Sequence, residues 1–169
     1  YPKEGVAILN IGNQYTNFSV IKGEDIVFCR DIPVGGALYT ADIQKALNVS
    51  LSEAEQLKLS ASGQEAPEEV TSIISSSHEI LCDEIMGSID FFTNTTPDVE
   101  ISKLYVSGGG SRTPGLVETI VQTSKIETEF LDSFKKIKVG KGVSRDSLHQ
   151  YKDILGVALG LGLRKLDEQ

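Results

Sequence analysis

The sequence predicts an α/β fold in which a mixed sheet is flanked by helices and carries a small helical insertion. Two observations support this prediction. Three β-type segments follow one another near the N-terminus, and a fourth apolar segment, residues 101–106, comes only after a long helical stretch. The fourth segment ends in Gly108, Gly109 and Gly110 and precedes another helical pattern, over residues 117–124, as in a strand–loop–helix unit.

The first three strands are predicted from apolar patterning. Residues 6–9 are a short apolar run suited to a strand buried on both faces. Residues 16–21 alternate polar and apolar side chains, and residues 26–32 follow after a turn at residues 22–25. Strands joined by such tight turns form an antiparallel meander, which we expect to end at residues 35–36.

Two short helices and one long helix are predicted next. Thr40 can cap a helix that runs to about residue 47, and Ser50 or Ser52 can cap another over residues 53–59. Pro67 followed by two glutamates is typical of a helix start. Apolar residues then recur at a spacing of three and four to about residue 93, so one face of this longest helix must belong to the core.

The C-terminal third is predicted to contain a short strand at residues 129–131, an irregular stretch at 134–139 and a last helix at about 148–166. The apolar side of that helix holds Ile154, Leu155, Ala158, Leu159 and Leu163. Three glycines inside it, at 156, 160 and 162, each weaken a helix by up to roughly 1 kcal/mol. We therefore expect another element to pack closely against them.

The composition fits one soluble domain, with 169 residues of which 40% are hydrophobic and 24% charged. A net charge of −8 argues against nucleic acid or an anionic membrane as the main partner. No apolar run approaches the roughly 20 residues that span a bilayer, and no signal-peptide pattern is present. Because the chain begins without Met and almost inside a strand, we expect it to be part of a larger protein.

Few side chains point to metal or nucleophilic chemistry. Cys29 and Cys82 are far apart, which fits a reducing compartment and disfavours a metal site; we expect both to be buried. His78 and His149 have no Cys, Asp or Glu arranged around them as ligands. We expect both histidines at a surface or interface, without a catalytic role.

Two loops have the composition of ligand-binding loops. The glycine triplet lets the backbone approach a flat or anionic ligand, and the following helix start offers unpaired N–H groups. A second such loop, residues 9–17, follows the first strand. Two loops of this kind in one small chain indicate the two walls of a nucleotide site. The alternatives are a tight turn for the triplet and a plain hairpin turn for the second loop.

Four segments resemble the actin-like ATPase superfamily, which includes actin, FtsA and sugar kinases, and within it the PilM family of type IV pilus assembly. They are residues 6–12 with 16–17, residues 30–36, residues 54–58, and residues 88–92 followed by 104–110 and 114–116. The resemblance covers most of the chain and implies the second half of the actin-like, ribonuclease H-like fold. It implies a core subdomain of residues 1–38 and 67–169 and an inserted subdomain of residues 39–66.

The resemblance implies that the chain binds ATP with Mg²⁺. The loop containing Gly12, Asn13 and Thr16 matches the family's second phosphate-binding hairpin, in which backbone N–H groups face the β- and γ-phosphates. The Thr16 hydroxyl can add a further contact. The glycine triplet would then run beside the adenine and the α-phosphate.

Glu55 and Lys58 match the family's E-x-x-K helix, and at a spacing of three they share one helix face. The resemblance implies that the carboxylate accepts from the ribose hydroxyls and that the ammonium lies over the base or the α-phosphate. The alternative is an exposed ion pair without a ligand.

Asn10 stands where the family usually has an Asp that holds magnesium through water. Asn keeps the hydrogen-bonding shape but lacks the charge, so Mg²⁺ loses a hard anionic partner at this indirect metal position. The change argues against efficient hydrolysis rather than against nucleotide binding. Residues 10–17 contain no carboxylate, whereas a small-molecule kinase needs one as a base near the γ-phosphate.

The implied function is an ATP-binding scaffold, at most a weak ATPase, in the inner-membrane assembly platform of the type IV pilus. It would be cytoplasmic and peripheral to the inner membrane, linking membrane assembly proteins to the cytoplasmic motor. The implied partners are the cytoplasmic N-terminal tail of PilN, bound by the half of the fold absent here, and the pilus motor and assembly proteins. Self-association stays open, and neither nucleic-acid binding nor direct membrane insertion is expected.

Three alternatives remain at this point. A small-molecule kinase of the same superfamily is disfavoured by the missing carboxylate. A structural relative that has lost its nucleotide fits Asn10 but is disfavoured by the glycine triplet and the E-x-x-K pair. An FtsA-like division protein usually carries a C-terminal amphipathic membrane helix, and residues 164–169 have too little apolar surface for one.

Overall fold

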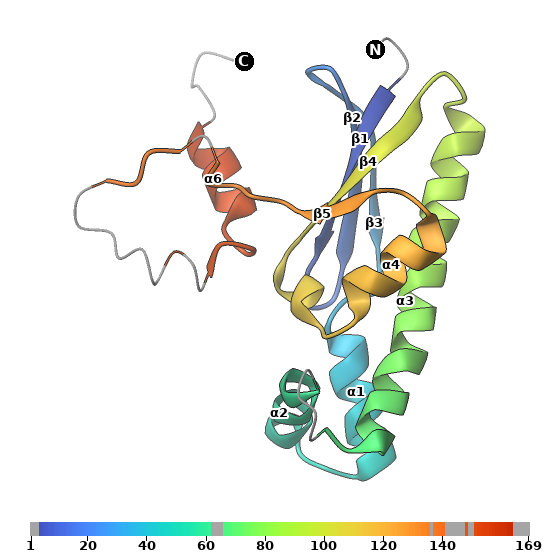
Figure 1. Ribbon diagram of the computed structural model, residues 1–169, viewed down its shortest axis with the longest axis vertical. Coiled ribbons are helices and arrows are strands. Elements are labelled where there is room, and N and C mark those ends of the chain that lie inside the picture. Colours follow the sequence, from blue (N-terminus) through green and yellow to red (C-terminus); the bar gives the residue numbers. More distant parts are fainter. Residues whose placement is uncertain (1–3, 62–65, 136, 141–147, 149–150, 164–169) are drawn as a thin grey trace.

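The computed structural model describes residues 4–61, 66–135, 137–140, 148 and 151–163. Within these residues a mixed sheet of five strands runs in the order β3-β2-β1-β4-β5 (Figure 1). The strands are β1 (Glu4–Ile11), β2 (Thr16–Lys22), β3 (Asp25–Ile32), β4 (Glu100–Ser107) and β5 (Thr128–Phe130). β2 is antiparallel to both β1 and β3, while β4 is parallel to β1 and β5. The predicted meander and mixed sheet are confirmed.

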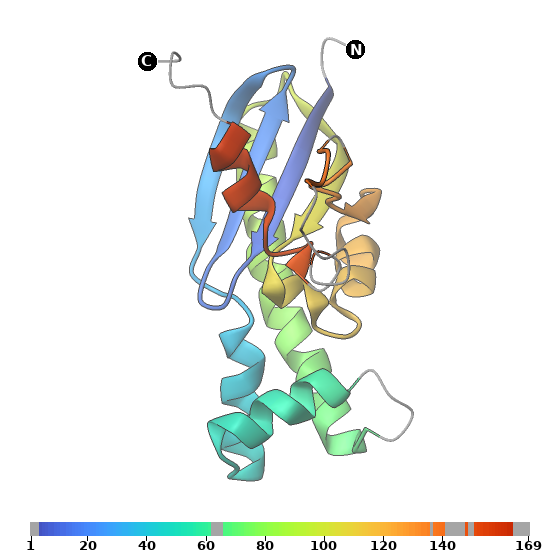
Figure 2. The ribbon, with the colours of Figure 1, turned by 90° about the vertical axis from the view of Figure 1, so that its left-hand side faces the viewer.

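Helices cover the sheet unequally. They are α1 (Ala37–Leu47), α2 (Leu51–Ser60), α3 (Glu68–Thr95), the 3₁₀ helix η1 (Gly109–Arg112), α4 (Leu116–Ser124) and α6 (Gly156–Leu163). Figure 1 shows α3 and α4 on one face of the sheet, with α1 and α2 beyond its end beside the first turns of α3. α6 lies on the opposite side and passes in front of the sheet in Figure 2. The predicted subdomain boundaries stay a prediction.

The core forms between the covered sheet face and α3. Alternate residues of β1 and β2, such as Leu9 and Phe18, are fully buried, as a half-covered sheet requires. The α3 side chains Leu81, Ile85 and Phe92, at helical spacing, are buried against them, which confirms the predicted core face of the long helix. Each such side chain contributes about 1.5–3 kcal/mol through burial, and together they hold the ends of β1 and β4 in place.

The prediction that Thr40 caps α1 is wrong. The helix begins earlier, at Ala37, because its first N–H groups find partners in the β1–β2 loop: Gly36 N donates to the Gly12 carbonyl at 2.9 Å and Ala37 N to the Asn13 carbonyl at 2.7 Å. Thr40 is therefore an interior residue of α1.

Of the two predicted caps of α2, Ser50 is the one observed. Its hydroxyl accepts from the Glu53 N–H at 3.3 Å, and the Glu53 carboxylate accepts from the Ser50 N–H at 2.9 Å. This is a complete capping box, which satisfies two donors at the start of the helix. The Ser50 hydroxyl also donates to the Glu53 carboxylate at 2.7 Å, and this bond, together with the one from the Ser50 N–H, lowers the pKa of Glu53.

The last helix is shorter than predicted. It is described from Gly156; residues 148 and 151 are helical as predicted, but residues 152–154 form a turn that interrupts the predicted helix. A Cβ at Gly156 would lie 3.0 Å from the Ser133 hydroxyl, so close approach is confirmed there. At Gly160 and Gly162 a Cβ would meet nothing within 4 Å among the described residues, so the predicted contact is wrong at these two positions. None of the described α6 residues is buried. Residues 164–166 lie outside the described part.

One of the two cysteines differs from its predicted burial. Cys82 is buried as expected, and burial together with the Asp83 charge raises the pKa of its thiol to about 11. Cys29 is exposed instead, because β3 is the edge strand and Cys29 faces away from α3. His149 lies outside the described residues. Within the described part, no helix is long and apolar enough to cross a membrane.

Candidate functional site

Three glycine-containing segments meet at the end of the sheet. They are the β1–β2 loop with Gly12, the segment before α1 with Gly36, and the β4–η1 segment with Gly108, Gly109 and Gly110. Besides the hydrogen bond between Gly36 and Gly12, a Cβ at Gly36 would lie only 3.5 Å from Gly110 Cα. The structure thus brings the two predicted loops, about a hundred residues apart, into backbone contact.

Only glycine fits at two of the three triplet positions. Gly108 has φ +88°, and a Cβ there would run into the Ile11 carbonyl and lie 2.7 Å from the Asn10 amide oxygen. A Cβ at Gly110 would lie 2.8 Å from the Gly12 carbonyl. Gly109 differs, because its Cβ would meet only the Ile154 side chain, at 3.6 Å. Contact between the loops therefore explains the glycines at 108 and 110, and no contact in the described chain requires the one at 109.

A second set of contacts holds the triplet from the C-terminal side. The Asp153 carbonyl accepts from Gly108 N at 2.7 Å and from the Ser107 hydroxyl at 2.8 Å. The Asp153 carboxylate, almost fully buried, accepts from Arg112 Nε at 2.9 Å. Sequence reasoning missed Arg112 and Asp153 because they are 41 residues apart and belong to no local motif.

Glu55 and Lys58 form the predicted pair on α2, and Thr40 of α1 completes it. Lys58 Nζ lies 2.8 Å from each oxygen of Glu55 and donates to the Thr40 hydroxyl at 3.0 Å. That hydroxyl in turn donates to Glu55 Oε2 at 2.7 Å. Partial burial raises the pKa of Glu55, but the hydrogen bonds from Lys58 and Thr40 and the Lys58 charge outweigh it, so the pKa is lowered.

A hollow of about 600 Å³ lies between α1 and α2. Its wall includes Asn13 from the β1–β2 loop, Thr40 from α1 and Glu55 from α2. Residues predicted from two separate motifs therefore border one space. Lys58 does not line it. The Lys58 side chain is 9% exposed, against 47% for that of Glu55.

Asn10 lies in a row of polar side chains across three strands. Its amide donates to the Asn17 amide oxygen at 3.2 Å, and the Asn17 amide donates to the Asp31 carboxylate at 2.5 Å. Thr16 is fully buried and its hydroxyl donates to the Val34 carbonyl at 2.8 Å. No group of three or more His, Cys, Asp or Glu side chains that could hold a metal occurs among the described residues.

His78 is buried between three segments and does not lie at the surface, which was one of the two places predicted for it. Its Nε2 lies 2.9 Å from the Pro114 carbonyl and its Nδ1 lies 2.7 Å from the Tyr39 hydroxyl. Because a carbonyl only accepts, Nε2 carries the proton and Nδ1 accepts from Tyr39. Burial lowers the pKa of His78, although the Pro114 bond and the Glu118 charge act in the opposite direction. His78 thus joins α3, α1 and the segment that follows η1.

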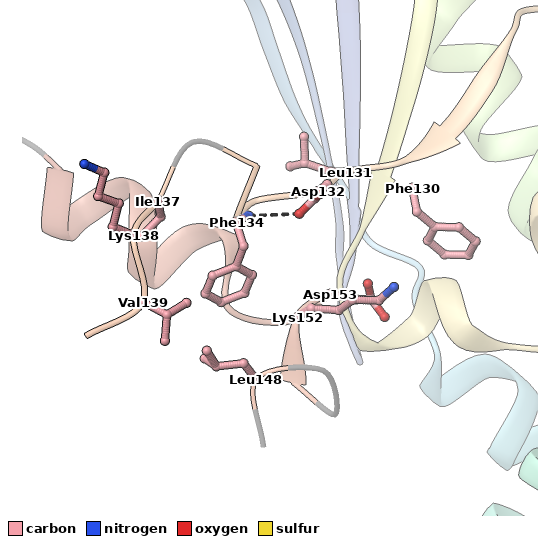
Figure 3. Close-up of a pocket in the computed structure, with 10 residues that line it drawn as sticks. All are labelled: Phe130, Leu131, Asp132, Phe134, Ile137, Lys138, Val139, Leu148, Lys152 and Asp153. Carbon is pink, nitrogen blue, oxygen red and sulfur yellow. Dashed lines mark hydrogen bonds between the residues drawn. The ribbon is translucent and has the colours of Figure 1, made fainter. Parts of the chain in front are cut away.

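A larger hollow of about 770 Å³ lies beyond β5 (Figure 3). Apolar side chains such as Leu131 and Phe134 contribute to its wall, together with Lys152 and Asp153. None of the sequence-predicted site residues lines it. The predicted residues gather instead around the glycine segments and the hollow between α1 and α2.

Solved structures with the same fold come from several actin-like proteins. The chain is 24% identical to a chain of the PilM–PilN type IV pilus biogenesis complex, with a TM-score of 0.84, and the match covers 96% of this chain and 46% of that one. For MreB5 of Spiroplasma citri bound to ADP the identity is 16% and the TM-score 0.69, with coverage of 96% and 53%. For the ethanolamine utilization protein EutJ from Carboxydothermus hydrogenoformans the identity is 17% and the TM-score 0.65, and the match covers 94% of this chain and 49% of that one.

These likenesses confirm the predicted actin-like fold, and the chain spans about half the length of each matched chain. At the level of sequence, the family model described as type IV pilus assembly protein PilM matches residues 2–166. This match covers nearly the whole chain. The chain therefore belongs to the PilM family of type IV pilus assembly proteins.

Proposed function

We propose that this chain supplies one wall of an ATP site in an actin-like scaffold of the type IV pilus inner-membrane assembly platform. The observation that carries the proposal is the meeting of the β1–β2 loop and the glycine triplet, next to a hollow that also exposes Glu55. Backbone segments without Cβ atoms suit phosphates and a flat base, and a half-exposed carboxylate suits ribose hydroxyls.

Each part of the site has its own task in this proposal. Backbone N–H groups around Asn13 face the β- and γ-phosphates, Gly109 passes beside the adenine, and Glu55 accepts from the ribose. Mg²⁺ enters with the triphosphate, because the described chain offers no acidic cluster to hold it alone. Asn10 would contact the ion through water, by its amide oxygen, while its amide nitrogen donates to Asn17.

The proposal assigns a binding role rather than efficient catalysis. Asp31 is the carboxylate of the polar row, and it already accepts from the Asn17 amide on the neighbouring strand. A base that activates water has to lie within hydrogen-bond reach of that water, and residues 10–17 offer no carboxylate beside the proposed phosphate hairpin. ATP would then act mainly by setting the conformation and partner affinity of the scaffold, with weak turnover at most.

The proposed partner is the cytoplasmic N-terminal tail of PilN, and through it the protein would be held at the inner membrane and linked to the pilus motor. The structural relative found in a PilM–PilN complex supports this partner class. This chain covers 46% of that relative; in this proposal the PilN tail binds the other half of the fold, so no residue here is assigned to the contact.

The test is calorimetric titration of MgATP into the complete natural protein and its Gly109→Ala variant. We expect micromolar binding by the natural protein and at least a tenfold loss in the variant, because the new methyl group would occupy the ligand side of the loop. Gly110→Ala is not a suitable substitute, since it disturbs the contact with Gly12 directly. Absence of binding by the natural protein would contradict the proposal and favour a relative that works without nucleotide.

Turnover is tested in the same preparation. Phosphate release by the natural protein should stay near background, and Asn10→Asp should raise it by restoring a charged partner for Mg²⁺. Rapid release that depends on an added small-molecule acceptor would instead favour a kinase.

A further inference from the structure

Thr40 occupies a position that no motif predicts. It lies in the first turn of α1, three residues after Ala37, and is 5% exposed. Its hydroxyl lies between the two charged side chains of α2, Glu55 and Lys58. Ammonium groups only donate, so the hydroxyl must accept from Lys58 and direct its own proton to Glu55. The direction of both hydrogen bonds is therefore fixed by chemistry.

The three side chains divide into a buried and an exposed part. Lys58 is 7% exposed, and an ammonium this deep needs partners for its protons; the contacts give it Glu55 and Thr40. The Glu55 carboxylate receives donors from Lys58 and Thr40 on one side and stays half-exposed, in the wall of the hollow between α1 and α2. The carboxylate is thus the member of the pair that a ligand can reach.

We propose that Thr40 is a positioning residue that holds the Glu55 carboxylate toward the ligand, with Lys58 acting through Glu55 rather than on the nucleotide. This inference rests on the proposed ATP site. Without the Thr40 hydroxyl, Glu55 keeps its ion pair but loses the hydrogen bond that fixes which way the carboxylate faces. A carboxylate that rotates freely forms a weaker and less selective bond to the ribose.

If Thr40 only stabilised the packing of α1 against α2, its substitution would have a different effect on nucleotide affinity. Loss of such a contact lowers stability and weakens every nucleotide alike. A positioning role instead lowers discrimination between nucleotides that differ at the ribose. The ratio of the affinities for ATP and 2′-deoxy-ATP is therefore the quantity that separates the two roles.

The experiment measures that ratio for the complete natural protein and for Thr40→Val, Thr40→Ser and Ser50→Ala. We expect the natural protein to prefer ATP, and Thr40→Val to bind ATP about tenfold more weakly, which brings the ratio close to one. Thr40→Ser, which keeps the hydroxyl, should restore the preference. Ser50→Ala is the matched control, since it removes the cap of α2 without touching Glu55 and should lower the unfolding temperature but not the ratio.

The outcomes separate the inference from the function on which it rests. An unchanged ratio in a folded Thr40→Val variant that still binds ATP overturns the positioning role and leaves the ATP site intact. Absence of ATP binding by the natural protein overturns both. If Thr40→Val does not fold, Thr40→Ala takes its place. The ratio of the affinities for ATP and 2′-deoxy-ATP should again fall close to one, and an unchanged ratio would again overturn the positioning role.

Discussion

The glycine junction and the α1–α2 triad, Thr40 with Glu55 and Lys58, are built by opposite means. At the junction, backbone meets backbone, and a Cβ at Gly108 or Gly110 would fall within 3 Å of a neighbouring chain segment. In the triad, side chains reach across between two helices at 2.7–3.0 Å. At Gly108 and Gly110 the junction leaves no room for a side chain, whereas the triad depends on which groups donate and which accept.

The largest expected effect breaks the junction. Gly108→Ala should lower the free energy of unfolding by about 3 kcal/mol or more, because it places a side chain at positive φ and against the Ile11 carbonyl. Urea unfolding followed by circular dichroism measures the loss. Gly109→Ala is the control within the same loop and should cost less than about 1 kcal/mol. Equal losses for the two variants would contradict the steric account.

An intermediate effect breaks the triad. Glu55→Gln removes the charge opposite the buried Lys58 ammonium, and we expect it to cost about 1–2 kcal/mol. The figure is below that of a fully buried pair because the Glu55 side chain is 47% exposed and partly screened. Urea unfolding of the natural protein and of Glu55→Gln, at low and at high salt, measures this loss of stability. The double variant Glu55→Gln, Lys58→Met should recover most of the loss; failure to recover would show that Lys58 is not held by charge.

The smallest expected effect is the pH dependence of the free energy of unfolding that arises from His78, which contacts α1 and the segment after η1. The pKa of His78 lies below its ordinary value near 6.5, so the unfolded chain binds this proton more readily than the folded one. The stability from neutral His78 is complete above about pH 6.5 and is lost as the pH falls toward the folded pKa. Unfolding measured at pH 7 and pH 5 should show a smaller drop for His78→Gln than for the natural protein. An equal drop would assign the pH dependence to other groups.

The two regions also differ in how well the sequence predicts them. The sequence shows directly where glycines occur, and a strand followed by a glycine triplet correctly predicts one side of the junction. The pair Glu55 and Lys58 is predicted from the resemblance to the family's E-x-x-K helix, and its spacing places both residues on one helix face. Thr40 was interpreted as a cap instead, because nothing in the sequence shows that Gly36 and Ala37 already find hydrogen-bond partners in the β1–β2 loop.

The remaining errors arise from contacts between distant segments. The sequence does not show that His78 is buried, because its partners, Tyr39 and Pro114, are 39 and 36 residues away. Cys29 looked buried because an apolar strand gives no sign that it lies at the sheet edge. The last helix was drawn too long because its periodicity does not reveal that Asp153 turns back onto the glycine triplet.

Tyr39 and Thr40 are neighbours on α1, yet one is bonded to His78 and the other to the α2 pair. Successive residues of an α-helix project about 100° apart, so these bonds hold α1 from two directions. A turn of α1 about its own axis would strain both at once. A change in the distance between α2 and the glycine junction therefore has to arise where α1 begins and ends, near Gly36 and near Asn48, whose backbone is left-handed with φ 53°.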